Sequence, residues 1–128
     1  MKNAIKKSII GFLFILFPFI MSSCEEDVWF IEGDWKVVEI SHHHGECPYY
    51  NGDIFTFYLD GELSVRGYQG FYERGYWDLS RNYLYIDFNG DGYEEIKARI
   101  RQNDSEYMVL DVVDYSYRSE YTLRMLSY

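Results

Sequence analysis

The residues best suited to chemistry in this chain are His42, His43 and His44, which are followed closely by Glu46 and Cys47. In an extended segment His42 and His44 point to the same side, and a thiolate at Cys47 would complete a Zn²⁺ or Cu⁺ site with them. The histidines are adjacent, however, and no spaced second pair of ligands follows. We therefore expect a polar loop beside an unpaired thiol, with a metal site at His42, His44 and Cys47 as the alternative.

A second group of ligand-type residues lies in the segment 87–92. Its oxygen-bearing side chains occupy the first, third and fifth positions of a calcium loop, with glycine at the sixth, and they are Asp87, Asn89 and Asp91. The glutamate that such a loop needs at position twelve is replaced by Ala98, so Glu94 and Glu95 are the only substitutes. Because the segment separates two predicted strands rather than two helices, we interpret it as a hairpin turn. We expect no metal and no other cofactor.

Motifs for catalysis are missing from the sequence. It contains no Gly-x-Ser-x-Gly, Ser-Lys or His-Glu-x-x-His pattern. The carboxylates are plentiful, but nothing in their spacing singles out a pair such as a glycosidase uses. We therefore expect no catalytic residues and no enzyme activity.

Tyrosine is unusually frequent, and all 14 tyrosines follow residue 24. Rigid amphipathic rings make good contact surfaces for sugars and proteins because they lose little side-chain entropy on binding. The alternative is that tyrosine simply suits a half-buried strand. The tyrosines that we expect at a binding rim are Tyr49, Tyr50, Tyr72, Tyr76, Tyr115 and Tyr117.

Charge and composition limit the kinds of partner. Residues 24–128 carry nine Lys and Arg against 21 Asp and Glu, which gives a net charge of −12. A chain this acidic lacks the clustered cations that nucleic acids and anionic membrane faces require, so we expect no nucleic acid among its partners. Aromatic residues make up 20% of the chain, which excludes a disordered protein. The length suits one domain with one hydrophobic core.

The elements that must position these residues are strands. From residue 34 onward, short runs of alternating polarity are separated by turn residues, and no stretch keeps a 3.6-residue apolar period. Asp60-Gly61 and Asn89-Gly90-Asp91-Gly92 are typical of tight hairpins. The pattern predicts an all-β chain with an eight-stranded antiparallel up-and-down sheet. The predicted strands are 34–41, 53–59, 62–68, 72–79, 83–88, 93–102, 107–114 and 120–126.

Alternation gives each predicted strand one apolar face and one wet face. An eight-stranded antiparallel sheet can bury its apolar face by closing into a barrel, which also removes the exposed edges. The predicted inward set is Phe55, Phe57, Leu59, Leu63, Val65, Leu84, Ile86, Phe88, Ile96, Ala98, Ile100, Met108, Leu110, Val112, Tyr121, Leu123 and Met125.

The start of the chain has the features of a secretory signal. Three lysines precede a 13-residue apolar run over 9–21, which is too short for a transmembrane helix of roughly 20 residues. The run leads into Met21-Ser22-Ser23-Cys24 and resembles the signal of bacterial lipoproteins, in which small or apolar residues precede a cysteine that is acylated. The predicted organisation is a signal peptide over 1–23, a lipid anchor and acidic tether over 24–33, and a barrel domain over 34–128.

The barrel domain resembles lipocalins and the shorter lipocalin-like lipoproteins of bacteria. The residues that carry the resemblance are Gly33-Asp34-Trp35, Phe55-Thr56-Phe57, Gly75-Tyr76-Trp77 and Tyr121-Thr122-Leu123-Arg124. The resemblance implies a small barrel closed at one end by Trp35, with the guanidinium of Arg124 packed on the indole; the alternative is a plain core aromatic and a solvated charge. The chain is shorter than full-length lipocalins, so we expect side chains to fill the interior and binding to occur at the rim.

These observations lead to one expected function and two alternatives. We expect a non-catalytic binding module, lipid-anchored in the outer membrane of a Gram-negative bacterium on the periplasmic or cell-surface side. Glu25-Glu26-Asp27 resembles an acidic signal for surface export, and a solubilising spacer is the alternative. The expected partner is a small molecule, a glycan or an envelope protein. The alternatives are a protein–protein inhibitor or accessory lipoprotein, whose acidic surface suits a basic enzyme, and a metal-handling loop protein.

Replacing Cys24 by serine tests the predicted lipid anchor. The Cys24→Ser variant should move from the detergent phase to the soluble fraction, because acyl chains contribute about 0.8 kcal/mol of membrane affinity per buried CH₂ group. Phase partitioning and mass spectrometry of the N-terminus measure this. A variant that stays with the membranes and keeps its first 23 residues would refute the lipoprotein interpretation.

Overall fold

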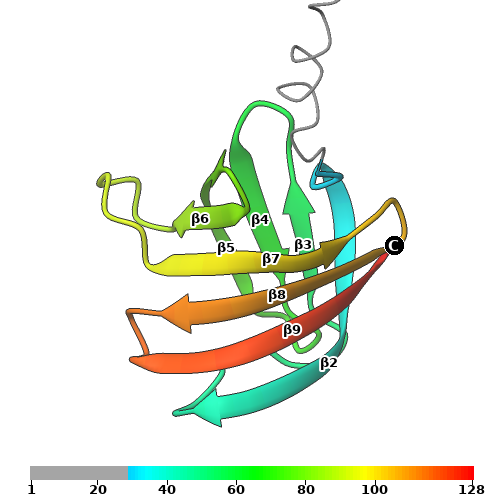
Figure 1. Ribbon diagram of the computed structural model, residues 1–128. Coiled ribbons are helices and arrows are strands. Elements are labelled where there is room, and N and C mark those ends of the chain that lie inside the picture. The colour runs from blue at the N-terminus through cyan, green and yellow to red at the C-terminus, as the bar shows by residue number, and fades with distance from the viewer. Residues whose placement is uncertain (1–28) are drawn as a thin grey trace, which may run out of the picture.

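The computed structural model describes residues 29–128, which form a closed barrel of eight antiparallel strands (Figure 1). Each strand pairs with the next along the chain, and the last pairs with the first. This confirms the predicted all-β up-and-down barrel. The strands are β2 (Gly33–His44), β3 (Ile54–Phe57), β4 (Glu62–Arg66), β5 (Tyr72–Ser80), β6 (Tyr83–Asp87), β7 (Ile96–Asn103), β8 (Tyr107–Asp114) and β9 (Ser119–Ser127). The predicted signal peptide and Cys24 lie outside the described residues.

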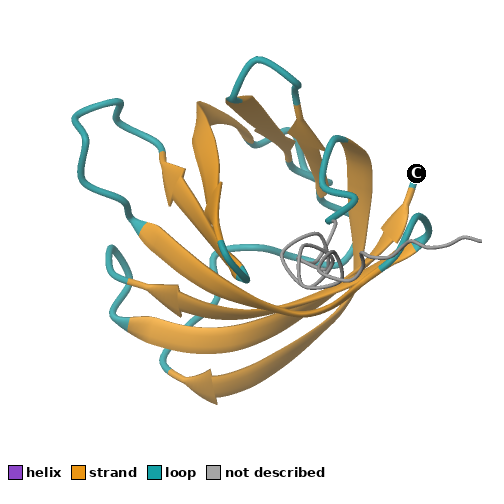
Figure 2. Cartoon of the chain, turned by 45° about the horizontal axis from the view of Figure 1, so that its top comes forward, coloured by secondary structure: helices purple, strands orange, loops and turns teal. Residues whose placement is uncertain are grey.

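The barrel closes where β2 pairs with β9. This ladder runs from Trp35 to His44 of β2, whereas the pairing of β2 with β3 covers only residues 33–36. Two β-bulges interrupt the long ladder, and bulges increase the twist that a closed sheet needs. Figure 2 shows the strands arranged around a common interior.

Side chains fill that interior, as the alternation predicts. Of the predicted inward set, all but two residues are buried. Phe88 is partly buried and packs against the core. The prediction for Leu59 is wrong: this residue follows β3 in a turn, where it is no longer held to the pleat of a strand, and it is 80% exposed. Within residues 29–128 no helix is long and apolar enough to cross a membrane.

One end of the barrel is closed by Trp35 and the residues that precede β2. Trp35 and Ile31 are both buried, and the indole Nε1 of Trp35 donates a hydrogen bond of 2.8 Å to the carbonyl oxygen of Ile31. Phe57 and Trp77 meet edge to face, with ring centroids 5.6 Å apart, and the Nε1 of Trp77 donates to the carbonyl of Tyr58 in the adjacent β3–β4 turn. The burial of Trp35 at this end is expected both of an aromatic that closes the barrel and of a plain core aromatic.

Part of the segment predicted as a tether, 24–33, belongs to the barrel. The indole Nε1 of Trp29 donates to the carbonyl oxygen of Arg81 in the β5–β6 turn. The side chain of Asn103 at the end of β7 bonds both the N–H and the carbonyl of Phe30. Residues 29–32 are therefore fixed at the closed end, where Ile31 is buried and Trp29 packs against the core.

Several strand boundaries differ from the predicted ones by one to three residues, and two of these differences affect the candidate metal ligands. The strand β2 continues to His44, because β9 offers pairing partners as far as Glu120. The histidines therefore lie in a strand and not in a loop. The strand β7 begins only at Ile96, because the carboxylates of Asp87 and Glu95 accept hydrogen bonds from backbone N–H groups of residues 88–92 and hold them in a loop.

Replacing Trp35 by alanine tests its role at the closed end. The Trp35→Ala variant should lose about 3 to 5 kcal/mol of unfolding free energy, as is usual for large aromatics removed from a core. Denaturant unfolding of the purified full chain measures this. The control is Tyr93→Ala, which removes a ring that is 78% exposed and should change stability by about 0.5 kcal/mol or less. A loss below about 1 kcal/mol in Trp35→Ala would contradict the assigned role.

Candidate functional site

The end of the barrel opposite Trp35 carries a pocket. The connections 45–53, 67–71, 88–95 and 115–118 all lie at this end, which we call the mouth, because successive antiparallel strands reverse direction. The pocket has a volume of about 170 Å³. Its lining residues, which come from all four connections and the adjoining strand ends, are Pro48, Tyr49, Phe71, Glu73, Phe88, Asn89, Glu95, Ile96, Asp114, Ser116 and Tyr117.

Asp114, the last residue of β8, organises one wall of this mouth pocket. Its side chain is buried, and its Oδ1 accepts hydrogen bonds of 3.1 Å from the backbone N–H groups of Ser116 and Tyr117. Its Oδ2 accepts a 2.7 Å hydrogen bond from the hydroxyl of Tyr121. Burial, followed by the nearby Tyr49 and Asp114, raises the pKa of Tyr121 well above its usual value. Asp114 thus fixes the 115–118 turn with a carboxylate held at the pocket.

Asp53, at the end of the 45–53 connection, fixes another part of the mouth. It is buried, and its two oxygens accept hydrogen bonds from the backbone N–H groups of Tyr50 (2.9 Å) and Tyr68 (2.8 Å). This carboxylate therefore joins the first and second connections of the mouth. The loop is also held to β2, since the Gly52 N–H donates to the Val37 carbonyl.

Glu73 points into the pocket from β5. Its neighbours at every second position on this strand, Gly75 and Trp77, also face inward, and the β4 residue opposite is the buried Val65. Burial raises the pKa of the Glu73 carboxyl, and the negative charges of Asp114 and Glu95 raise it further. The surroundings of Glu73 thus disfavour its charged form relative to water.

Gly75 is required for the shape of this wall. A Cβ atom at this position would lie 2.8 Å from the carbonyl oxygen of Asp87 and 2.9 Å from the Cα of Phe88. No side chain fits there without moving the backbone. The glycine lets the end of β6 approach β5, and this places Phe88 over the pocket beside Glu73.

Tyr49 forms the inner wall. It is only 4% exposed, and its ring packs edge to face on Phe55 at 5.0 Å between centroids. Burial raises its pKa well above the usual value, and the negative charges of Glu73 and Asp114 act in the same direction. Its only hydrogen bond within residues 29–128 is the one from its backbone N–H to the Sγ of Cys47, so its hydroxyl has no partner there.

The predicted rim tyrosines are not all brought together. Tyr49 and Tyr117 line the mouth pocket, and Tyr50 lies beside it in an open groove of about 460 Å³ between β2 and the loops at 49–51 and 68–69. Tyr115 lies in the mouth connection but lines neither the mouth pocket nor this groove. Tyr72 and Tyr76 point to the outside of β5, and Tyr76 lines a separate surface groove of about 390 Å³.

The larger hollows are therefore at the surface, and the interior below Tyr49 is packed. This agrees with the expectation that side chains fill the interior. The lining of the 460 Å³ groove is mostly exposed residues, whereas the residues of the barrel interior form one continuous buried cluster.

The carboxylates of the calcium-like segment lie close together but accept hydrogen bonds from their own loop. Oxygens of Asp87, Asp91 and Glu95 lie within 4.8 Å of one another. The Oδ1 of Asp87 accepts from the N–H groups of Asn89 and Gly90, and its Oδ2 accepts from that of Gly92. The partly buried Glu95 accepts from the backbone N–H of Phe88 and from the side-chain amide of Asn89. These bonds stabilise the 88–95 loop, in agreement with the prediction of a turn.

The histidine and cysteine residues do not form a ligand cluster. Within residues 29–128 the acidic trio Asp87, Asp91 and Glu95 is the only group of three His, Cys, Asp or Glu side chains with ligand atoms this close together. His42, His44 and Cys47 are therefore not brought together. Burial raises the pKa of Cys47 to about 11, although the N–H of Tyr49 acts against the shift, so the sulfur is a protonated thiol at neutral pH.

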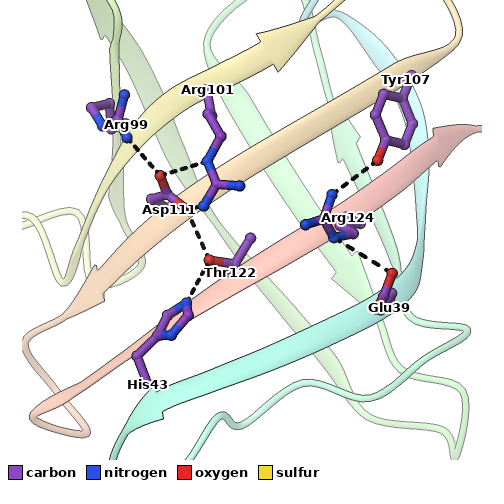
Figure 3. Close-up of polar contacts among 8 residues, drawn as sticks. All are labelled: Glu39, His43, Arg99, Arg101, Tyr107, Asp111, Thr122 and Arg124. Atoms are coloured by element: carbon purple, nitrogen blue, oxygen red, sulfur yellow. Dashed lines mark hydrogen bonds and ion pairs between the residues drawn. The ribbon is translucent and has the colours of Figure 1, made fainter.

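The outer face of β7, β8, β9 and β2 carries a polar network (Figure 3). Asp111 accepts hydrogen bonds from Arg99 (2.9 Å) and Arg101 (2.6 Å), and also from the hydroxyl of Thr122. Because that proton goes to Asp111, the Nε2 of His43, 2.8 Å from the same hydroxyl, must be the donor. His43 is thus not placed to remove a proton from Thr122, as a catalytic base would.

Arg124 belongs to this outer face and does not cover Trp35. Its guanidinium lies between the hydroxyl of Tyr107 (3.2 Å) and the carboxylate of Glu39 (3.4 Å) (Figure 3). On β9, Leu123 and Met125 point inward, so Arg124 points outward by the alternation of the strand. The cations that lie over aromatic rings within the described residues are Lys36 and Lys97. The expectation of an Arg124–Trp35 contact is therefore not met.

Sequence reasoning missed two of the main residues of the mouth, Glu73 and Asp114. The alternation of the strands could have identified both residues. Glu73 shares its side of β5 with Gly75 and Trp77, which face inward. Asp114 shares its side of β8 with Leu110 and Val112, which are buried. An inward acid near a strand end is costly to bury and therefore indicates a polar site.

A comparison with protein-family models and a search of curated proteins gave no match to this chain. The barrel architecture therefore rests on the strand order and register described above.

Replacing Glu73 by glutamine tests the electrostatics of the mouth. Because the folded-state pKa of Glu73 is raised above the usual 4.5, its ionisation weakens the fold as pH rises through and beyond that value. Glu73→Gln should therefore gain stability relative to the unchanged chain between pH 4.5 and 7. Urea unfolding of the full chain at both pH values measures the difference. The control is Glu94→Gln, an exposed residue of the 88–95 loop. If the unfolding free energy of Glu73→Gln decreased relative to that of the unchanged chain as pH rises, the assignment would be contradicted.

Proposed function

We propose that this chain is a lipid-anchored, non-catalytic binding module of the envelope of a Gram-negative bacterium, similar to lipocalins, that takes its ligand at the mouth. The observation that carries the proposal is the mouth pocket, where four connections converge on aromatic rings and three carboxylates. Pockets with convergent polar groups and perturbed pKa values are the usual binding sites of proteins. Here the pKa values of Glu73, Tyr49 and Tyr121 are all raised.

The position of the predicted anchor supports this assignment. Cys24 precedes Trp29 by five residues, and Trp29 is fixed to the closed end through Arg81. Five residues span at most about 17 Å, so an acylated Cys24 would keep the closed end near the membrane. The mouth would then face away from the lipid, where a ligand from the periplasm or the exterior has access.

A protein partner is the second candidate, and the exposed aromatic residues of the mouth favour it. Tyr50, Tyr115 and Tyr117 are each more than half exposed, and exposed tyrosines are typical of protein contact surfaces. The net charge of −12 for residues 24–128 would attract a basic partner. An inhibitor or accessory lipoprotein of the envelope would use the same end of the barrel.

Recovery of the native ligand tests the proposed function. The full chain is purified from its own membranes with a non-ionic detergent, and co-purifying small molecules, glycans and proteins are identified by mass spectrometry. We expect a ligand that is lost from a variant of the exposed mouth residue Tyr117→Ser. The control is Glu106→Gln, in the β7–β8 turn at the closed end, which should retain it. A ligand lost only from the closed-end variant would contradict recognition at the mouth.

A further inference from the structure

The mouth pocket holds more negative charge than its lining neutralises. Glu73, Glu95 and Asp114 line it, and no lysine, arginine or histidine is among its lining residues. Asp114 and Glu95 are each fixed by hydrogen-bond donors of the protein. Glu73 accepts no hydrogen bond within residues 29–128, so its carboxylate is free to accept one from a ligand.

Tyr49 gives a second, independent indication of a ligand. Its side chain is 96% buried and lines the pocket, yet its hydroxyl has no hydrogen-bond partner among the described residues. Among the described residues the fully buried side-chain oxygen without a partner is Ser119 Oγ and not the Tyr49 hydroxyl, so the phenol oxygen is still open to a small donor. Tyr49 and Glu73 both line this small space, which a hydrogen-bond donor between them would occupy.

The lining favours an organic cation over a metal ion. Glu73 and Asp114 belong to no group of three acidic, His or Cys side chains within 4.8 Å in residues 29–128, so they do not provide the tight oxygen shell that Ca²⁺ requires. The remaining walls are largely apolar: Phe71, Phe88 and the ring of Tyr49. Aromatic faces attract organic ammonium groups. The volume of 170 Å³ equals that of about six water molecules, which suits an alkyl ammonium of a few carbons.

We infer that the mouth pocket binds a small organic ammonium group, which donates hydrogen bonds to the Glu73 carboxylate and the Tyr49 hydroxyl while its alkyl part lies against Phe71 and Phe88. The inference rests on the proposed function and names the ligand class of the same site. The ammonium supplies the positive charge and the donors that the lining lacks. The source is either a free amine or a lysine side chain of a partner.

Titration of the purified full chain with n-butylammonium chloride tests this inference. Calorimetry should give saturable binding with a dissociation constant on the order of a millimolar or tighter, within the limit for so few atoms. Glu73→Gln should weaken binding about tenfold and Tyr49→Phe about threefold, as expected for a charged and a neutral hydrogen bond. The matched control, Glu94→Gln, removes the same charge from an exposed site outside the pocket and should bind as the unchanged chain does.

The comparison ligands separate the possible outcomes. Equal binding of n-butanol would show that the pocket recognises only the hydrocarbon, and binding of CaCl₂ that displaces butylammonium would show an inorganic cation site; either overturns the inference. Failure of butylammonium to bind also overturns it. The proposed function is judged separately, because a native ligand lost with Tyr117→Ser would leave it intact.

The peptide Gly-Lys-Gly distinguishes the two sources of the ammonium group. If the peptide binds more tightly than butylammonium, the inference is supported with a partner lysine as the source. If it binds more weakly, the inference is supported with a free amine as the source.

Discussion

The pairing of β2 with β9 is the constraint on which the rest of this structure depends. Without it both strands would be open edges, and the inward side chains of the sheet would face water. The ladder runs well past the end of β3, so the chain after β2 must turn back over the interior to reach β3. The return is fixed by hydrogen bonds between Val37 of β2 and residues 52–53. Closure of the barrel thereby places Tyr49 as the inner wall of the mouth.

The two ends of the barrel have opposite chemistry as a result. At the closed end, the indole N–H groups of Trp29, Trp35 and Trp77 all donate to backbone carbonyls. Each ring therefore packs among apolar side chains while its N–H group keeps a hydrogen bond. At the mouth, the buried acids Asp53 and Asp114 hold the connections by accepting backbone N–H groups. The same carboxylates that order these loops make the mouth negative. A packed interior leaves this end as the place for a ligand.

The fold was more predictable from the sequence than the site. Alternation predicts the inward residues because burial of a sheet face depends mainly on local pattern, and it is wrong for Leu59, where a strand ends. The expectation of a loop at His42–His44 is wrong because the length of β2 depends on its partner β9, which local pattern does not reveal. The roles of Glu73 and Asp114 depend on which connections share an end of the barrel. Arg124 points outward because its neighbours on β9, Leu123 and Met125, point inward. The family resemblance does not specify which residues of this strand face the interior.

The central claim is that the Glu73 carboxyl takes up a cationic ligand at the mouth. The most direct measurement is the pKa of Glu73, followed by the ¹³C shift of its side-chain carboxyl in the full chain, with and without butylammonium. In the free protein this pKa should lie above its usual value because of burial and the charges of Asp114 and Glu95. A bound ammonium should lower it, since an adjacent positive charge favours the ionised form. A Glu73 pKa that is unchanged at saturating ammonium would contradict the account.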